Sequence, residues 1–168
     1  MRRLVLFRHA KAEAHAAGGR DFDRGLTKRG RRDAELMGKV IVQEGFAPDV
    51  ALVSSAKRAR QTWQAAATAM PSAACELHPD LYNASPEEIA TAVRSAARSA
   101  GTVMVIGHNP GLQELAVNLL VEGGAEEDIE RVSQKFATAS VAVFGIASDG
   151  KASLCGLYHA RDHGGDGE

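Results

Sequence analysis

The chain of 168 residues contains only two cysteines, few aromatic residues and no long apolar run. Cys75 and Cys155 provide neither a disulfide framework nor the ligand spacing of a metal site, so we expect both to be small residues in strands. No segment approaches the roughly 18 consecutive apolar residues of a membrane span. The apolar run 4–7 is too short for a signal peptide, and charged residues follow it directly. We therefore expect a cytoplasmic protein with no membrane association.

The charges almost cancel, with 20 Lys and Arg against 21 Asp and Glu and a formal net charge of −1. This balance argues against a general nucleic-acid binder or a membrane-surface protein, so any anion site must be local. The hydrophobic fraction of 45% is typical of a globular protein, and the length suits one domain. We predict a monomer with a single domain over residues 1–158. Residues 159–168 lack core-forming side chains and are predicted to be a flexible tail.

Apolar, strand-like runs alternate with helical patterns along most of the chain. The expected strands are 4–7, 49–53, 75–78, 102–106, 141–146 and 152–158. The expected helices are 27–44, 56–70, 86–99, 111–121 and 126–135. Such alternation predicts an α/β fold with three layers, in which a mostly parallel sheet carries helices on both faces. The last two strands flank a Ser-Asp-Gly turn and should form an antiparallel hairpin at one edge.

The first strand runs directly into Arg8 and His9. A short apolar run of this kind suits a buried parallel strand, whose carboxyl end lies at the edge where open α/β sheets bind ligands. Arginine is rarely buried without a partner, so the pair suggests an anion site. A solvated loop after the strand is the alternative reading of this pair taken alone.

The second strand leads through two serines into a helix start that carries Lys57, Arg58 and Arg60. Cations are disfavoured by about 0.3–1 kcal/mol each at a helix N-terminus, whereas a bound anion reverses that preference. We expect Arg58 to contact an anion and the other two side chains to point to solvent. The fourth strand ends in the same way at His108 and Asn109, so a shared edge would bring the three strand ends together.

This set of side chains suits phosphoryl transfer. A histidine can attack phosphorus and carry the phosphoryl group transiently, while cationic groups hold the equatorial oxygens. We assign His9 as the nucleophile, and Arg8, Arg58 and His108 as catalytic groups that bind the phosphoryl oxygens, with Asn109 as a further phosphate contact. The sequence has no HExxH, no Asp-rich cluster and no CxxC, so we expect no metal and no cofactor.

The segments LVLFRHAKAE, LTKRG, SSAKRARQT and VIGHNPGL together resemble the histidine phosphatase superfamily, which has a phosphoglycerate mutase-like fold. The Arg-His-Ala-Lys form of the first motif is similar to SixA-type phosphohistidine phosphatases. The resemblance covers about residues 3 to 121 and implies a phosphohistidine intermediate on His9. It also implies phosphate contacts from Arg8, Arg58 and His108, and a bacterial phosphotransfer domain as the partner.

One position departs from the mutase-like members, which carry a glutamate proton donor where this chain has Asn83. An alkoxide leaving group needs an acid, whereas an imidazole leaving group can take a proton on its own ring. The nearby Asp80, Glu87 and Glu88 are interpreted as loop and helix-cap acids, and His15 as solvated. We expect a metal-independent phosphatase of protein phosphohistidine. The alternatives are a phosphatase of small phosphoesters and a phosphate-recognition module without turnover.

Overall fold

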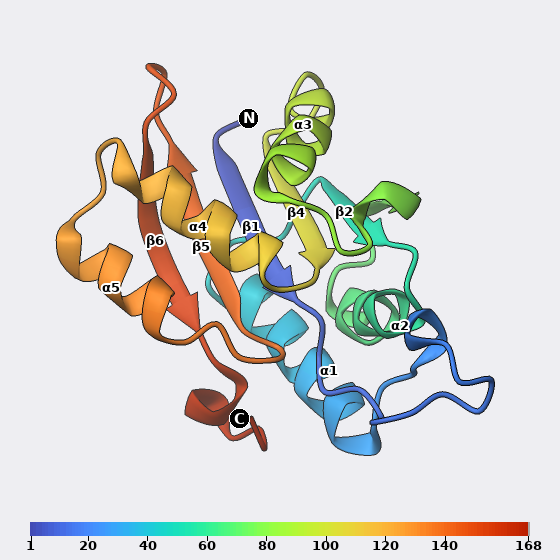
Figure 1. The fold of residues 1–168 in the computed structure, drawn as a ribbon. Coiled ribbons are helices and arrows are strands. Elements are labelled where there is room, and N and C mark those ends of the chain that lie inside the picture. The colour runs from blue at the N-terminus through green and yellow to red at the C-terminus, as the bar shows by residue number, and fades with distance from the viewer. Residues whose placement is uncertain (168) are drawn as a thin grey trace.

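The computed structural model describes residues 1–167, which fold around one six-stranded sheet (Figure 1). The strand order is β3-β2-β4-β1-β5-β6. The strands are β1 (Arg3–Arg8), β2 (Val50–Ser54), β3 (Ala74–His78), β4 (Thr102–Gly107), β5 (Val141–Ile146) and β6 (Ala152–Tyr158). The first four are mutually parallel, whereas β5 pairs antiparallel with β1 and with β6. The expected mostly parallel sheet with a terminal antiparallel hairpin is confirmed.

Helices cover both faces of the sheet, which gives the three layers that the alternation predicted. They are α1 (Lys28–Gln43), α2 (Lys57–Ala66), α3 (Pro86–Ala96), α4 (Gly111–Val121) and α5 (Glu126–Gln134). One core lies between the sheet and α3, α4 and α5, and the other lies between the sheet and α1 and α2. Successive residues of the central strands enter opposite cores, as Leu6 and Phe7 do in β1, because side chains alternate across a sheet.

Local sequence signals set the helix starts. Thr27 caps α1 by accepting a hydrogen bond from the Gly30 N–H at 2.9 Å. Ser85 and Glu88 form a complete capping box at the start of α3, where Pro86 occupies the first turn. These caps explain why both helices begin where the sequence indicated.

Close backbone packing brings α1 against α2. A Cβ atom on Gly38 of α1 would lie 2.4 Å from the carbonyl oxygen of Ala66 in α2. A Cβ on Gly30 would lie 2.1 Å from the carbonyl oxygen of Lys11, in the segment that follows β1. Glycine is therefore required at both positions, and the contact fixes α1 against the loop that leaves the first strand.

The segment after Tyr158 corrects one expectation. Ala160–His163 form a 3-10 helix, η4, and Ala160 is buried in the core beside α1. The backbone N–H of Asp166 also donates to the buried carboxylate of Asp33 at 3.0 Å. The prediction that this segment contributes nothing to the core is therefore wrong, and residue 168 lies outside the described residues. Within residues 1–167, every helix is too short or too polar to cross a membrane.

Candidate active site

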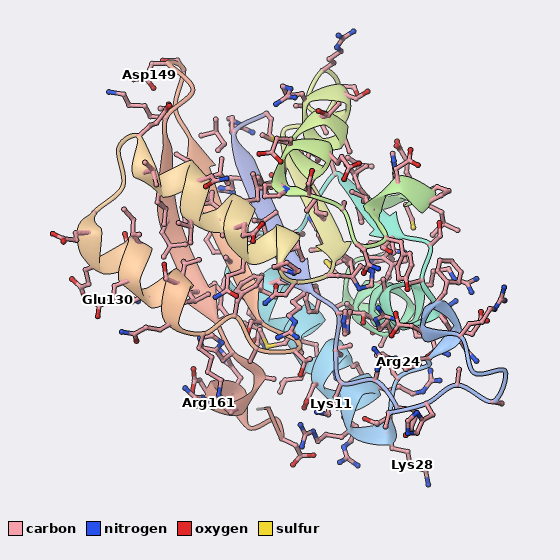
Figure 2. The ribbon with its side chains drawn as sticks, in the orientation of Figure 1. Lys11, Arg24, Lys28, Glu130, Asp149 and Arg161 are labelled. Carbon is pink, nitrogen blue, oxygen red and sulfur yellow. The ribbon has the colours of Figure 1, made fainter. Side chains whose placement is uncertain are left out.

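The carboxyl ends of β1, β2 and β4 meet at one edge of the sheet, because the three strands are parallel. A cleft of about 300 Å³ opens there. Its lining is strongly basic and comes from six separate segments: Arg8, His9, Lys11, Ala12, Arg24, Arg58, Asn83, His108, Asn109 and Thr138. Figure 2 shows Lys11 and Arg24 at the end of the molecule toward which β1 points. The structure thus brings all five predicted site residues to one hollow.

His9 is held by its backbone and by one ring nitrogen. Its N–H donates to the Gly107 carbonyl at 3.0 Å, and its carbonyl accepts from the Ala139 N–H at 3.2 Å. The ring Nδ1 lies 2.9 Å from the carbonyl oxygen of Ala10, which can only accept, so Nδ1 carries the proton. Nε2 therefore carries the lone pair, which faces Arg58. Burial, with a smaller contribution from the nearby arginines, lowers the pKa of His9 to about 4, so the ring is neutral at pH 7.

Arg58 lies in the first turn of α2, where its side chain is 4% exposed. Its Nε–H donates to Nε2 of His9 at 3.3 Å. The neighbouring Lys57 and Arg60 are exposed, as expected. One turn further on, the buried hydroxyl of Thr62 accepts from the Ala10 N–H at 3.0 Å and donates to the carbonyl of Arg58 at 2.8 Å. This hydroxyl therefore ties the loop after β1 to the start of α2.

The other two nitrogens of Arg58 bind Asp21, which belongs to a short 3-10 turn, η1 (Asp21–Asp23). NH1 donates to the backbone carbonyl of Asp21 at 2.8 Å and NH2 to its carboxylate at 3.0 Å. The same carboxylate accepts from the hydroxyl of Tyr82 at 2.7 Å and from Nε of Arg24 at 2.8 Å. These hydrogen bonds, that of Tyr82 first, hold the pKa of Asp21 well below its usual range. Asp21 is therefore an ionised acceptor and not a proton donor.

His108 stands beside His9 with the ring centroids 5.1 Å apart. Its Nε2 lies 2.8 Å from the hydroxyl of Ser54 at the end of β2. Its Nδ1 is buried, and no group among residues 1–167 hydrogen-bonds to it. Burial above all lowers the pKa of His108 to about 3, so this ring is also neutral at pH 7. A buried ring nitrogen without a protein partner is available for a ligand.

Arg8 and Asn109 meet at a single backbone oxygen. NH1 of Arg8 donates to the Phe136 carbonyl at 2.8 Å, and Nδ2 of Asn109 donates to the same oxygen at 3.1 Å. The second hydrogen of that amide goes to Gln113 at 3.2 Å. The side-chain amide of Asn109 therefore has no N–H left for an anion in this arrangement, and the phosphate contact expected of Asn109 stays a prediction. This amide holds the Asn109 segment to Gln113 and to the Phe136 carbonyl at one wall of the cleft.

The acids near the expected proton-donor position do not reach the cleft. Asn83 lines it, with a positive φ of 56°, which asparagine tolerates better than most residues. Asp80, Glu87 and Glu88 line a separate groove between β3 and α3. None of the cleft-lining residues is a carboxylic acid. The cleft can bind a phosphoryl group and offer a nucleophilic nitrogen to it, but it offers no acid to the leaving group.

Comparison with known proteins agrees with this geometry. The model of the histidine phosphatase superfamily (branch 1) matches residues 4–89, which include Arg8, His9 and Arg58. The chain belongs to the histidine phosphatase superfamily. Membership in this superfamily supports phosphatase activity.

The similarity to known relatives extends over almost the whole chain. An uncharacterized protein of Mycobacterium tuberculosis (strain H37Rv) is 34% identical over 161 residues, 92% of this chain and 99% of that protein. The structure of a proposed phosphohistidine phosphatase SixA from Agrobacterium tumefaciens superposes with a TM-score of 0.82 at 30% identity, covering 94% and 97% of the two chains. The protein histidine phosphatase SixA complexed with tungstate has a TM-score of 0.80 at 21% identity, covering 95% and 98%.

Asp21, Tyr82 and Thr62 are among the residues around this site that were not predicted from the sequence. Asp21 bonds to Arg58 from the short turn η1, Tyr82 bonds to Asp21 from a turn before α3, and Thr62 lies inside α2 among other polar residues that do not mark it out. One signal was present: an acid three residues before Arg24, in the loop that leads to the Leu-Thr start of α1. His15 is exposed, as expected.

Proposed function

We propose that this protein is a metal-independent phosphatase that removes phosphate from phosphohistidine on a partner protein, through a phosphohistidine formed on its own His9. The observation that carries the proposal is the lone pair on His9 Nε2. It faces the Nε–H of Arg58 at 3.3 Å within a cleft lined by Arg8, Lys11 and Arg24 as well. A neutral ring nitrogen among fixed cations is what in-line attack on a phosphoryl group requires.

In the first step, Nε2 of His9 attacks phosphorus, the new N–P bond forms, and the bond from phosphorus to the leaving nitrogen breaks. The ring of the substrate histidine already carries a proton on its other nitrogen, so it keeps the electron pair of the broken bond and leaves as neutral imidazole. The ring of His9 becomes cationic, and its Nδ1–H bond to the Ala10 carbonyl, at 2.9 Å, stabilises that charge. Arg8, Arg58 and Nδ1 of His108 hold the equatorial oxygens. In the second step, a water molecule attacks phosphorus, the N–P bond to His9 breaks, and Nε2 recovers its electron pair. Phosphate is released with the protons of the water, and neutral His9 is regenerated.

The preference for phosphohistidine rests on the leaving group. No carboxylic acid lines the cleft, and the carboxylate of Asp21 beside it is held ionised. An alkoxide would leave without a proton donor, whereas an imidazole supplies its own protonation site. The similarity to a proposed phosphohistidine phosphatase SixA at 30% identity supports the same substrate class. A phosphotransfer domain is the partner that we propose, and a monomer in the cytoplasm remains the expectation from the sequence.

The test compares two substrates in the presence of a metal chelator: a phosphorylated histidine-containing phosphotransfer domain and an alkyl phosphate, whose alkoxide needs an acid to leave. We expect rapid turnover of the first, slow turnover of the second, and no effect of the chelator. His9→Ala should remove activity, and the exposed His15→Ala variant is the matched control. Turnover of the ester alone would favour the small-phosphoester alternative. Binding of phosphate without turnover of either substrate would identify a recognition module.

A further inference from the structure

Asp21 bonds to Arg24 and Arg58, two of the residues that line a cleft built for an anion, where a carboxylate is the least expected side chain. Its side chain is 50% exposed and ionised. A negative charge in this position repels a phosphoryl group and weakens its binding. The carboxylate therefore needs a structural role that outweighs this repulsion.

The contacts of Asp21 converge on Arg58. The carbonyl and the carboxylate of Asp21 accept from NH1 and NH2 of Arg58 at 2.8 and 3.0 Å. The guanidinium group is planar, so holding two of its nitrogens fixes the direction of the third N–H. That third group, Nε–H, points at Nε2 of His9, where the transferred phosphorus would sit. Asp21 thus uses the two nitrogens that face away from the reaction.

Two further side chains hold the carboxylate itself. Arg24 donates from Nε to Oδ1 at 2.8 Å, and the Tyr82 hydroxyl donates to Oδ2 at 2.7 Å. The guanidinium carbon of Arg58 also lies 5.7 Å from the centre of the Tyr82 ring. Arg24 belongs to the same segment as Asp21, so Asp21 joins this segment to those that carry Arg58 and Tyr82. The chain between β1 and α1 passes beside α2 at this point (Figure 1), and Figure 2 labels Arg24 there.

We propose that Asp21 is a positioning residue, which orients the Arg58 guanidinium so that its Nε–H meets the transferred phosphoryl group. This inference deepens the proposed function and rests on it for the turnover step. In the free enzyme the Nε–H of Arg58 donates to His9. When the N–P bond forms, that lone pair is consumed, and the same N–H is directed to a phosphoryl oxygen without rotation of the guanidinium.

The two effects of Asp21 have opposite signs, which makes the proposal testable. If its charge alone mattered, removing the carboxylate would strengthen phosphate binding. If it positions Arg58, removing it weakens phosphate binding, because the best-directed donor is lost. The charge effect survives when Arg58 is absent, whereas the positioning effect requires Arg58. A double-mutant cycle between the two residues therefore separates them.

The experiment measures binding of inorganic phosphate by calorimetry, and turnover of the phosphorylated domain, for Asp21→Asn with and without Arg58→Ala. Asp23→Asn is the matched control, because Asp23 lies in the same turn and pairs with the exposed Arg20 at 2.6 Å. We expect Asp21→Asn to weaken phosphate binding and to lower kcat by about tenfold each, the size of one lost charge-assisted hydrogen bond. In the Arg58→Ala background it should leave binding unchanged or tighter. Tyr82→Phe should reproduce part of the loss.

Equal or tighter phosphate binding by Asp21→Asn in the otherwise intact protein would overturn the proposal. So would the same loss in both backgrounds, or the same loss in Asp23→Asn, because either would indicate a general effect on the turn. The phosphate measurement needs no substrate, so its outcome is independent of the proposed function. If the wild type fails to hydrolyse phosphohistidine while the cycle still shows coupling, the proposed function fails and the role of Asp21 stands.

Discussion

Lowering the pH from 7 to 5 should destabilise this protein through the two buried histidines of the cleft. Burial lowers the pKa of His9 to about 4 and that of His108 to about 3, from 6.5 in the unfolded chain. As the pH falls below 6.5, the unfolded chain binds protons that the folded rings still exclude. The free energy of unfolding is therefore unaffected by the titration of these two rings above pH 6.5. It decreases progressively as the pH falls from 6.5 toward the pKa values of the folded protein.

The size of the effect follows from these pKa values. Between pH 7 and pH 5, each ring costs about 2 kcal/mol of unfolding free energy, and the pair costs about 4 kcal/mol. Whole domains are typically stable by only about 5–15 kcal/mol, so the loss is readily measured. The carboxylate of Asp21 does not contribute in this window, because its usual pKa of 3.8 lies below it and the folded value is lower still.

Urea unfolding at pH 7 and pH 5 measures this loss in the wild type and in two variants. His9→Gln and His108→Gln should each lose about 2 kcal/mol less than the wild type between the two pH values, since each lacks one titrating ring. The exposed His15→Gln is the control and should behave as the wild type. An equal pH dependence in all four proteins would refute the claim that the two cleft rings are held neutral by burial.

Three further predictions concern packing and binding. Thr62→Val should lower stability by about 1–3 kcal/mol and reduce activity, because the Ala10 N–H loses its buried acceptor. Thr62→Ser keeps the hydroxyl and should keep the activity. Equal activities of the Thr62→Val and Thr62→Ser variants would contradict this prediction. Gly38→Ala should destabilise the protein by about 1–3 kcal/mol, because the added Cβ would lie 2.4 Å from the Ala66 carbonyl oxygen. Gly18→Ala is the control, because a Cβ there meets nothing within 4 Å. Thermal unfolding of both variants measures the difference in stability. Phosphate binding at pH 7 should take up no protons, because the pKa values of about 4 for His9 and about 3 for His108 lie far below pH 7; calorimetry in buffers of different ionisation enthalpy would show an uptake if either ring became charged.

The meeting of His9, Arg58 and His108 could be predicted from the sequence because it depends only on the order and direction of the strands. Each residue follows a strand of the same direction, so their meeting at one edge depends on parallel pairing and not on loop conformation. The same reasoning could not assign partners to their hydrogen bonds. Asn109 shows this limit, since it reaches the cleft but donates both amide hydrogens to the protein.

Asp21, Tyr82 and Ala160 could not be predicted for a different reason. Asp21 lies in the single turn η1 and Tyr82 in a turn before α3, segments too short to show a period, and the two residues are 61 positions apart in the chain. Their contact depends on how two loops fold over the cleft. Ala160 is a single small residue in a polar tail, and it is buried only because η4 packs against α1. One apolar residue produces no periodic signal, so composition alone favoured a tail outside the core.

Trapping the phosphoryl group on the enzyme tests the central claim most directly. After mixing with a ³²P-labelled phosphohistidine domain and rapid quenching at alkaline pH, the wild type should carry acid-labile phosphate in the peptide that contains His9. Nuclear magnetic resonance should assign it to Nε2, because Nδ1 is bonded to the Ala10 carbonyl. His9→Ala should carry none. Turnover without any labelled enzyme, or label on a different residue, would contradict the account.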